Sequence, residues 1–187
     1  MEKGFFFTGF PGFICNQLIR EVLKRNQLNG SVFVLVLPDM VERAKKESAA
    51  IIAEYGLDES TFHIIVGDIT KPFLAITEEE QEDIQPRVTH VFHLAAIYDL
   101  AVPREIAQKV NVNGTENVND WVRRLPNLDR YIYFSTAFVV GNREGTLYET
   151  ELIEPPGFKN HYEQTKYEAE VLVETLKKEV PVTIIRP

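Results

Sequence analysis

Short, continuous apolar runs alternate along the chain with stretches in which apolar residues recur every three or four positions. Continuous apolar runs are typical of strands that are buried on both faces of a parallel sheet. The spaced pattern predicts amphipathic helices, which connect such strands. We predict strands over Gly4–Thr8, Ser31–Leu37, Phe62–Val66, His90–Leu94, Arg130–Ser135 and Val182–Ile185. We predict helices over Ile14–Arg25, Val41–Tyr55, about Pro103–Arg124, and Glu163–Lys178.

This alternation predicts an α/β fold, a three-layer, Rossmann-type doubly wound parallel sheet. The 187 residues suit a single domain with a full hydrophobic core, so residues 1–187 are interpreted as one domain. The acidic stretch Glu78–Asp83 is interpreted as the solvated face of a helix, with a charge-specific docking site as the alternative.

Composition excludes several classes of protein. The net charge of −8 argues against a nucleic-acid or anionic-membrane partner, although a local pocket for one phosphate stays compatible with it. No apolar run is long enough to cross a bilayer, and the N-terminal run breaks at Thr8–Gly12, too early for a signal peptide. Cys15 is the single cysteine, so no internal disulfide can form. We therefore expect a cytoplasmic protein with no transmembrane segment.

The turn between the first strand and the first helix carries two glycines. Gly9 suits a position with unusual backbone dihedrals, and Gly12 suits a position where backbone approaches a pyrophosphate. The helix that follows points unpaired N–H groups and its positive dipole end at the turn. A plain tight turn explains two glycines equally well, but the location in the first strand–helix unit favours a nucleotide. Cys15 stands where a third small residue is normally found, and packing is favoured over a reactive thiol.

A second motif lies at the start of the last helix. Tyr162 and Lys166 are four residues apart, which places both side chains on one helix face. A neighbouring ammonium favours the phenolate and lowers the pKa of a tyrosine, which makes the phenol a usable acid or base. An exposed pair with no function is the alternative, because this spacing also occurs by chance.

The fifth strand ends in two hydroxyls, Ser135 and Thr136, at the carboxyl edge of the sheet. Open α/β sheets bind their ligands at this edge. A hydroxyl there can hydrogen-bond a substrate carbonyl oxygen while Tyr162 donates the proton. The alternative is that both hydroxyls only cap the strand, but Tyr162 and Lys166 follow one loop later, which favours the functional interpretation.

With these motifs in order, the whole chain resembles the extended short-chain dehydrogenase/reductase superfamily. It looks most like the branch that contains fatty acyl-CoA reductases and the thioester-reductase domains of carboxylic acid reductases, the NAD-binding male sterility type. The resemblance rests on ordered motifs: Thr8–Ile14, Gly67-Asp68-Ile69, His93-Leu94-Ala95-Ala96, Asn111-Val112-Asn113-Gly114-Thr115, Ser135-Thr136, Tyr162 with Lys166, and Ile185-Arg186-Pro187.

The resemblance implies roles for these residues around an NAD(P)(H) cofactor. The pyrophosphate would be surrounded by Gly9, Phe10, Pro11, Gly12, Phe13 and Ile14. Asp68 and Ile69 would meet the adenine, and Asp68 would accept from its amino group. The ribose and the path to the nicotinamide would be lined by Leu94, Ala95 and Ala96, with Asn113 supporting that loop. Pro187 would approach the nicotinamide.

The resemblance also implies a catalytic triad of Thr136, Tyr162 and Lys166. Thr136 would polarise the substrate, with Ser135 as its less favoured substitute. Tyr162 would be the acid/base, and Lys166 would bind the nicotinamide ribose while it lowers the pKa of Tyr162. Hydride transfer itself is the chemistry of the cofactor. No metal ligands are assigned.

The choice between NAD and NADP stays open at this point. Users of NADP in the family commonly carry an arginine after the second strand, where this chain has Leu37. Arg43 lies a turn into the next helix. Asp39 suits either a bond to a free ribose hydroxyl or a cap on that helix.

The chain ends at Pro187, whereas extended members of the family continue with a substrate-binding segment. We therefore expect the N-terminal, NAD(P)-binding part of a longer protein that acts on a small-molecule carbonyl, alcohol or thioester. The alternatives are a nucleotide-sugar epimerase or dehydratase that retains NAD, and a non-catalytic dinucleotide-binding sensor. By analogy with the family, a homodimer that pairs through the helix bearing Tyr162 is also expected.

Overall fold

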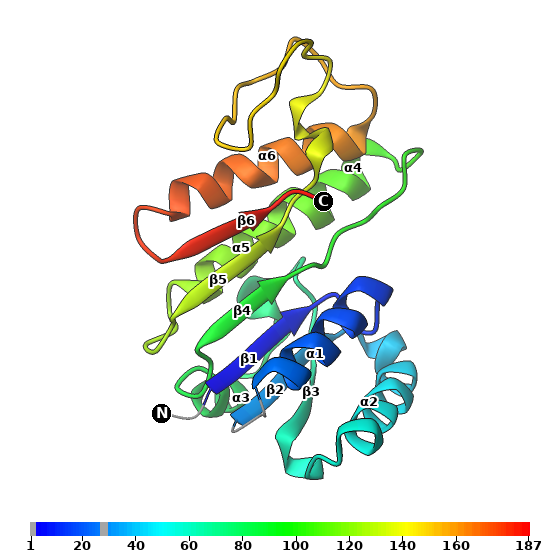
Figure 1. The fold of residues 1–187 in the computed structure, drawn as a ribbon, viewed down its shortest axis with the longest axis vertical. Coiled ribbons are helices and arrows are strands. Elements are labelled where there is room, and N and C mark those ends of the chain that lie inside the picture. Colours follow the sequence, from blue (N-terminus) through cyan, green and yellow to red (C-terminus); the bar gives the residue numbers. More distant parts are fainter. Residues whose placement is uncertain (1–2, 27–29) are drawn as a thin grey trace.

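The computed structural model describes residues 3–26 and 30–187, which form one sheet of six parallel strands (Figure 1). The strands are β1 Lys3–Thr8, β2 Gly30–Val36, β3 Phe62–Val66, β4 His90–His93, β5 Arg130–Phe134 and β6 Val182–Ile185. Their spatial order is β3-β2-β1-β4-β5-β6. The order reverses between β1 and β4, which is the place where open α/β sheets bind ligands. The predicted doubly wound parallel sheet is confirmed.

Helices connect successive strands. The α-helices are α1 Phe13–Asn26, α2 Val41–Tyr55, α3 Glu78–Ile84, α4 Arg104–Ala107, α5 Gly114–Val122 and α6 His161–Leu176. Short 3₁₀ turns cover Pro38–Met40, Glu59–Thr61, Pro72–Ala75 and Ala137–Val140. Within the part of the chain that the structure describes, no helix is both long enough and apolar enough to traverse a bilayer.

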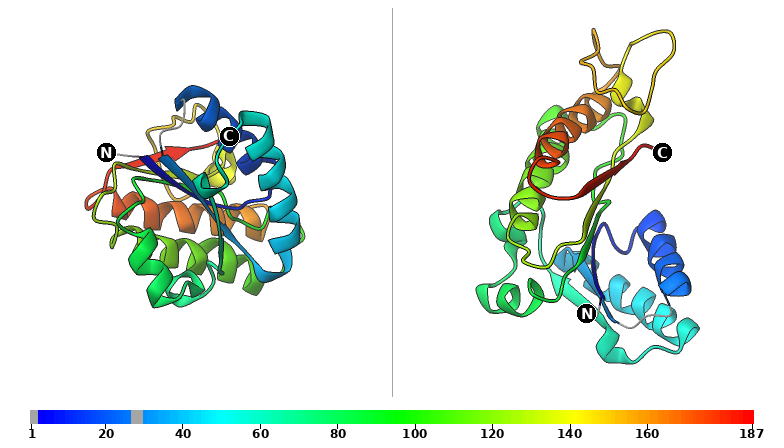
Figure 2. Two further views of the ribbon diagram at one scale, coloured as in Figure 1. Left: turned by 90° about the horizontal axis from the view of Figure 1, so that it is seen from below. Right: turned by 60° about the vertical axis from the view of Figure 1, so that its left-hand side comes forward.

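Helices cover both faces of the sheet (Figure 2), and each face has its own apolar core. Helices α1 and α2 pack on one face, where Phe7, Val34 and Ile19 belong to one buried apolar cluster. Helices α3, α5 and α6 pack on the other face, where Tyr133 and Trp121 belong to the second cluster. Successive residues of a strand point to opposite faces, so strands with cover on both sides need apolar residues at every position. The run Phe5-Phe6-Phe7 in β1 meets this need.

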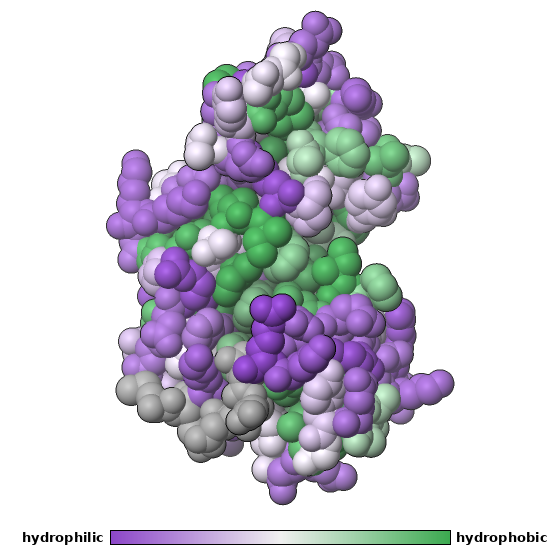
Figure 3. All heavy atoms as spheres, viewed as in Figure 1, coloured by the Kyte–Doolittle hydropathy of each residue, from purple (hydrophilic) through white to green (hydrophobic). Residues whose placement is uncertain are grey.

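The two halves of the sheet are covered differently. Residues of β1 and β2 enter both clusters, whereas β5 and β6 contribute only to the cluster of α5 and α6. On the opposite face of β5 and β6, Phe134 is half-buried and Ile185 is exposed. Figure 3 shows an apolar surface over these two strands, with a hollow at its right-hand edge. Three layers are therefore complete around β1–β3, and two layers form around β5 and β6.

The predicted helix over Pro103–Arg124 is interrupted. A π-helical turn over Gln108–Asn113 separates α4 from α5. Such turns insert a residue into the helix and re-aim its side chains, and they are frequent at functional sites. Here the turn brings the Asn111 side chain onto the loop after β4, where it bonds the backbone of Ile97. Periodicity alone does not reveal an inserted residue.

The acidic stretch forms helix α3, as predicted. Thr77 accepts a hydrogen bond from the backbone N–H of Glu80, and the Glu80 side chain returns to the Thr77 backbone. This capping box begins the helix, and the acidic residues in its first turn suit the positive end of the helix dipole. Ile84 is buried below them. The acidic side chains therefore form a solvated helix face.

Candidate functional site

Two neighbouring cavities lie at the carboxyl edge of the sheet. The first has a volume of about 340 Å³, and the second about 730 Å³. Both are lined by Gly9, Gly12, Ala95 and Ala96, which belong to the segments that follow β1 and β4. The cavities therefore meet at the point where the strand order reverses, and together they provide one elongated site.

The two glycines of the first turn are required by close backbone contacts. Gly9 has a φ of 93°, and a Cβ atom there would lie 3.0 Å from the Ala95 nitrogen. Gly12 donates to the Gly9 carbonyl at 2.9 Å, and a Cβ on Gly12 would lie 2.7 Å from that oxygen. Any larger side chain would displace backbone at either position. The turn is therefore a cradle formed by main chain alone.

The turn leads directly into α1, whose first residue is Phe13. The first N–H groups of a helix have no partner within the helix, and the dipole adds positive potential there. Cys15 is 1% exposed and packs in the core beside Phe7 and Phe10. Burial raises the pKa of its thiol, which opposes the reactive thiolate. Cys15 is therefore a packing residue between the helix and the sheet.

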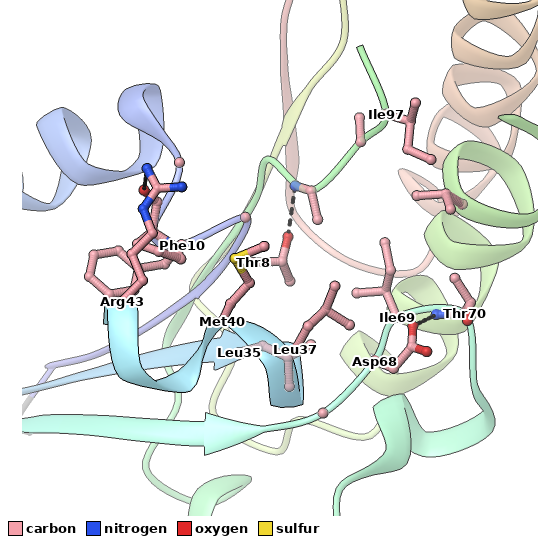
Figure 4. A pocket seen from close by; sticks show the side chains of 17 residues that line it. Thr8, Phe10, Leu35, Leu37, Met40, Arg43, Asp68, Ile69, Thr70 and Ile97 are labelled. Carbon is pink, nitrogen blue, oxygen red and sulfur yellow. Dashed lines mark hydrogen bonds between the residues drawn. The ribbon is translucent and has the colours of Figure 1, made fainter. Parts of the chain in front are cut away.

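Figure 4 shows the first cavity. The loop after β3 lines one side of it, which we call the far wall. The Asp68 carboxylate accepts from the Thr70 N–H at 2.8 Å, and the Asp68 N–H donates to the Leu74 carbonyl at 2.8 Å. Ile69 is buried, and its carbonyl accepts from the Asn117 side chain at 2.7 Å. These bonds hold Asp68 and Ile69 on the cavity wall, where adenine is expected.

The loop has an unusual backbone. Phe73, Leu74 and Ala75 have φ values of 53°, 59° and 54°, so three consecutive non-glycine residues occupy the left-handed region. That region costs roughly 1–2 kcal/mol for each L-residue with a side chain. Leu74 is fully buried, and its carbonyl holds the Asp68 N–H. Hydrophobic burial thus offsets backbone strain beside the cavity.

The segment after β2 lines another side of the first cavity, which we call the near wall. Leu37, Met40 and Arg43 line the cavity, and the Arg43 guanidinium donates to the Pro11 carbonyl at 3.4 Å. Figure 4 shows Arg43 reaching from α2 to the glycine turn. Asp39 is exposed and is not among the lining residues, and Met40 occupies the N-cap of α2. Asp39 is therefore neither the helix cap nor a wall of the cavity.

The second cavity contains the predicted catalytic residues. Thr136, Tyr162, Lys166 and Pro187 line it together with the glycine turn. Helix α6 begins at His161, and Asn160 caps it by accepting from the Glu163 N–H at 2.9 Å. Tyr162 and Lys166 therefore lie on successive turns at the cavity end of this helix. Both residues line the second cavity.

Thr136 and Ser135 have different partners. The Thr136 hydroxyl accepts from the Phe138 N–H at 3.3 Å, and its interaction with Tyr162 lowers the pKa of that phenol. The Ser135 hydroxyl bonds the fully buried carboxylate of Glu170, which also pairs with Arg186. Although both residues line the cavity, this arrangement leaves Thr136 as the hydroxyl that is coupled to the phenol.

The pKa of Tyr162 differs from the expectation. Burial raises it above its ordinary value, while the neighbouring Thr136 acts in the opposite direction and Tyr98 raises it further. Tyr98 meets Tyr162 edge to face, with ring centroids 5.0 Å apart. The predicted lowering by Lys166 is not found, because desolvation is the largest influence on this phenol.

Lys166 is 3% exposed, and its ammonium donates to the Tyr133 hydroxyl and to the Phe134 carbonyl, both at 2.8 Å. Desolvation lowers the pKa of Lys166 from 10.5 to about 7, and the charge of Glu170 partly opposes this change. A lysine with such a pKa changes its charge near neutrality, where an ordinary lysine is always charged.

Asn113, to which the resemblance assigns the support of the loop after β4, lies away from both cavities. Its side chain is exposed, and it does not line either cavity. The loop after β4 is instead supported by Asn111, which accepts from the Ile97 N–H at 2.9 Å and donates to Thr165 at 3.1 Å. Residues two apart in a helical segment point to nearly opposite sides. The structure therefore assigns the loop to Asn111, the first asparagine of the motif.

Apart from Asn113, all residues to which the resemblance assigns a role at the cofactor or the substrate line one or both cavities. Sequence reasoning missed the aromatic side chains at the mouth of the second cavity, Tyr98 and Phe138, and the buried partner of Lys166, Tyr133. The signal for Tyr133 was available, because its strand alternates and Tyr131 and Tyr133 share one face. The signal for Tyr98 was weak, since it lies in a loop without periodicity.

Comparison with known proteins supplies independent observations. The sequence model of an NAD-binding family described as male sterility protein matches residues 7–187. A putative fatty acyl-CoA reductase of Drosophila melanogaster is 29% identical over 154 residues, which cover 79% of this chain and 28% of the relative. The Drosophila melanogaster fatty acyl-CoA reductase wat is 26% identical, and the aligned region covers all of this chain and 42% of the relative. The chain thus spans less than half the length of these relatives.

Solved structures agree in fold. The terminal R domain from the myxalamid PKS-NRPS biosynthetic pathway has a TM-score of 0.83 and 25% identity, covering 100% of this chain and 48% of that one. UDP-glucuronic acid 4-epimerase from Bacillus cereus, in complex with UDP-glucuronic acid and NAD, has a TM-score of 0.69 and 24% identity. The match covers 98% of this chain and 55% of the epimerase chain. The epimerase likeness is one of fold alone.

Proposed function

We propose, because the chain belongs to the male sterility protein family of NAD-binding domains, that it is the cofactor-binding and proton-donating part of an NAD(P)-dependent reductase. One observation carries this proposal. A phenol, a lysine and a hydroxyl converge with the glycine turn on a single cavity of about 730 Å³. Its neighbour of about 340 Å³ completes an elongated site for a dinucleotide.

The residues present fit such a cofactor. Gly9 and Gly12 line both cavities without a side chain, so this turn suits a pyrophosphate against main-chain N–H groups. Asp68 and Ile69 suit an adenine on the far wall, and Ala95 and Ala96 leave space between the two cavities. When bound, the nicotinamide supplies or accepts the hydride.

Three side chains would perform the remaining chemistry. Thr136 and Tyr162 would hold the reacting oxygen of the substrate, and the Tyr162 hydroxyl would deliver its proton to that oxygen as negative charge develops. Lys166 keeps one ammonium hydrogen beyond its two bonds to β5, and this hydrogen is available to a ribose hydroxyl. The protein thus aligns donor and acceptor and supplies the proton.

We propose an acyl thioester, or the aldehyde derived from one, as the substrate. The named relatives are fatty acyl-CoA reductases, and the mouth of the second cavity is apolar. Phe13, Tyr98 and Phe138 line it and are 78%, 69% and 49% exposed. Exposed aromatic residues around a cavity suit a ligand with a hydrocarbon chain.

We propose NADP(H) rather than NAD(H) as the preferred cofactor. A free ribose hydroxyl is usually recognised by a carboxylate near the end of β2, and a 2′-phosphate by an arginine. Among the described residues that line the first cavity, the near wall carries Arg43 and no carboxylate. A guanidinium suits a phosphate because it offers several charge-assisted donors.

The proposal is tested with NADPH, NADH and an acyl-CoA. Saturable enhancement of reduced-nicotinamide fluorescence by the folded protein is expected, and absence of binding at millimolar nucleotide contradicts the cofactor assignment. Turnover is followed as net loss of reduced-nicotinamide absorbance with the thioester present. An epimerase would bind NAD but consume none, so net oxidation separates the two reactions.

A further inference from the structure

Lys166 is held by two neutral oxygens of β5, and one of them belongs to a side chain with no assigned role. Its ammonium donates at 2.8 Å to the Tyr133 hydroxyl and at 2.8 Å to the Phe134 carbonyl. Lys166 and Tyr133 are 3% and 1% exposed, so water does not replace either bond at low cost. The position of the Tyr133 oxygen therefore matters to Lys166.

The hydrogen positions around Tyr133 follow from counting donors, starting at the glycine turn. The Thr8 hydroxyl accepts from the Leu94 N–H at 3.2 Å and the Ala95 N–H at 3.1 Å. Its own hydrogen is then free for His93 Nδ1, which lies 2.7 Å away. His93 consequently carries its hydrogen on Nε2 and is neutral. Burial lowers the pKa of His93 to about 3, in agreement with this tautomer.

The chain of bonds continues to Thr115, which is a neighbour of Tyr133. His93 Nε2 lies 3.1 Å from the Thr115 hydroxyl and donates to it. The Thr115 hydroxyl donates to the Asn111 carbonyl at 2.6 Å, and a carbonyl can only accept. Thr115 has therefore used its hydrogen and has none left to donate to the neighbouring Tyr133. The Lys166 ammonium has no lone pair, so the Tyr133 oxygen can only accept from it.

We propose that Tyr133 is a positioning residue, whose phenolic oxygen holds the Lys166 side chain at the cavity and favours its charged form. Tyr133 does not line either cavity, so it acts through Lys166. Its relevance to cofactor binding rests on the proposed function, whereas its effect on Lys166 does not. The lysine ammonium also lies 4.5 Å from the centroid of the Tyr133 ring, which adds a cation–π contact.

Other groups near Lys166 act in known directions. On its own helix, Glu170 favours the charged form, and Arg186 and Ser135 hold that carboxylate in place. Tyr162 lines the same cavity as Lys166. From β4, the neutral His93 interacts electrostatically with Lys166. Removal of the Tyr133 phenolic oxygen removes none of these groups. The effect of that oxygen on Lys166 can therefore be measured separately.

The strand itself provides a matched control. Tyr131 lies two residues before Tyr133 on the same face and is fully buried. Its hydroxyl has no hydrogen-bond partner among the residues that the structure describes. Tyr131→Phe and Tyr133→Phe remove the same atom from the same strand. Only the second change removes an acceptor from Lys166.

The first experiment follows the Lys166 side chain by NMR in protein with isotope-labelled lysine, as a function of pH and without cofactor. The signal is assigned by its loss in Lys166→Met. Tyr133→Phe is expected to move the titration midpoint of Lys166 to lower pH, because a hydrogen bond to the charged form is lost. Tyr131→Phe is expected to leave it unchanged. An unchanged midpoint in Tyr133→Phe, or an equal change in both variants, overturns the proposal.

A second pair of variants covers the case in which Tyr133→Phe does not fold. Thr115→Val removes the hydroxyl that interacts with Tyr133, and Thr115→Ser retains it. A lower midpoint for Lys166 in the valine variant, with recovery in the serine variant, supports the proposal. Equal midpoints in both contradict it.

Cofactor affinity is then measured by NADPH fluorescence with the same proteins. Tyr133→Phe is expected to bind about tenfold more weakly than the wild type above neutral pH, as expected for the loss of one charge-assisted bond, and similarly to it in acid, where Lys166 is charged in both. If NADPH does not bind even to the wild type, the proposed function fails, while the NMR result still decides the role of Tyr133. If NADPH binds and both proteins show the same pH dependence, the link from Tyr133 to the cofactor is wrong.

Discussion

The two halves of the sheet contribute to the site by different means. The half formed by β1–β3 is covered by helices on one face and by the second core on the other, and it supplies a binding surface made largely of backbone, with Gly9 and Gly12 at its centre. The half formed by β4–β6 supplies side chains with exchangeable protons, Thr136, Tyr162 and Lys166. Recognition of an anion needs rigid main-chain donors, whereas proton transfer needs side chains whose environment tunes their pKa.

Anion recognition and proton transfer are therefore supplied by separate parts of the sheet, which meet at Ala95 and Ala96. Substitutions in one half should affect affinity, and substitutions in the other should affect turnover. The following predictions test this separation, beginning with the largest expected effect.

Tyr162→Phe should reduce the turnover number by about 10²–10⁴-fold, the usual contribution of a positioned acid or base. NADPH affinity should be nearly unchanged, because the glycine turn and the first cavity are untouched. The measurement combines steady-state kinetics with a fluorescence titration. Tyr98→Phe, which keeps the ring against Tyr162, is the control for aromatic packing. Normal turnover in Tyr162→Phe would remove the phenol from the chemistry.

Gly12→Ala should weaken NADPH binding on the order of a hundredfold, or about 3 kcal/mol. The added Cβ would lie 2.7 Å from the Gly9 oxygen, so the turn must open. Lys166 should keep its titration midpoint in the NMR experiment, since its two hydrogen-bond partners are on β5. Thermal unfolding of the same protein checks that the fold persists. Unaltered affinity in a folded variant contradicts the cradle.

Arg43→Ala should weaken NADPH binding about tenfold and leave NADH binding nearly unchanged, because a charge-assisted bond to phosphate is lost. This variant tests how the half formed by β1–β3 recognises a single group of the cofactor, the 2′-phosphate. Asp39→Ala is the matched control, because Asp39 is exposed and lies outside the cavity lining. An equal loss for both nucleotides would show that Arg43 does not read the 2′-phosphate.

Ala75→Gly should stabilise the protein by about 1 kcal/mol, since Ala75 has a φ of 54° and glycine adopts that conformation without strain. The same substitution at Ala50, an exposed position inside α2, should destabilise by about 0.5–1 kcal/mol. Chemical denaturation measures both changes. Destabilisation by Ala75→Gly would indicate that the left-handed run carries no strain.

Much of the fold could be predicted because its signals are local. Continuous apolar runs such as Phe5-Phe6-Phe7 indicate burial on both faces, and the six predicted strands are confirmed with changes of one residue at some ends. The π-turn over Gln108–Asn113 could not be predicted, since an inserted residue depends on what the helix packs against. That turn also explains why Asn111 rather than Asn113 supports the loop after β4.

The site was predictable where it depends on spacing along the chain. The Gly9 and Gly12 turn and the Tyr162–Lys166 pair are of this kind, and the structure brings them to one cavity. The electrostatics were not predictable in the same way. The pKa of Tyr162 depends on burial and on Tyr98, and that of Lys166 on partners from β5. Such partners are distant in sequence and become neighbours only through the order of the strands.

The two hydrogen bonds of Lys166 have a consequence for the floor of the second cavity. A neutral amine has two hydrogens, which are enough to keep both the Tyr133 and the Phe134 bonds. With a pKa of about 7, deprotonation would therefore leave the nitrogen where it is and replace a hydrogen by a lone pair. The floor of the cavity would change from a hydrogen donor to an electron-pair donor with no movement of heavy atoms, and an incoming hydroxyl group would have to reverse its own orientation to bind there.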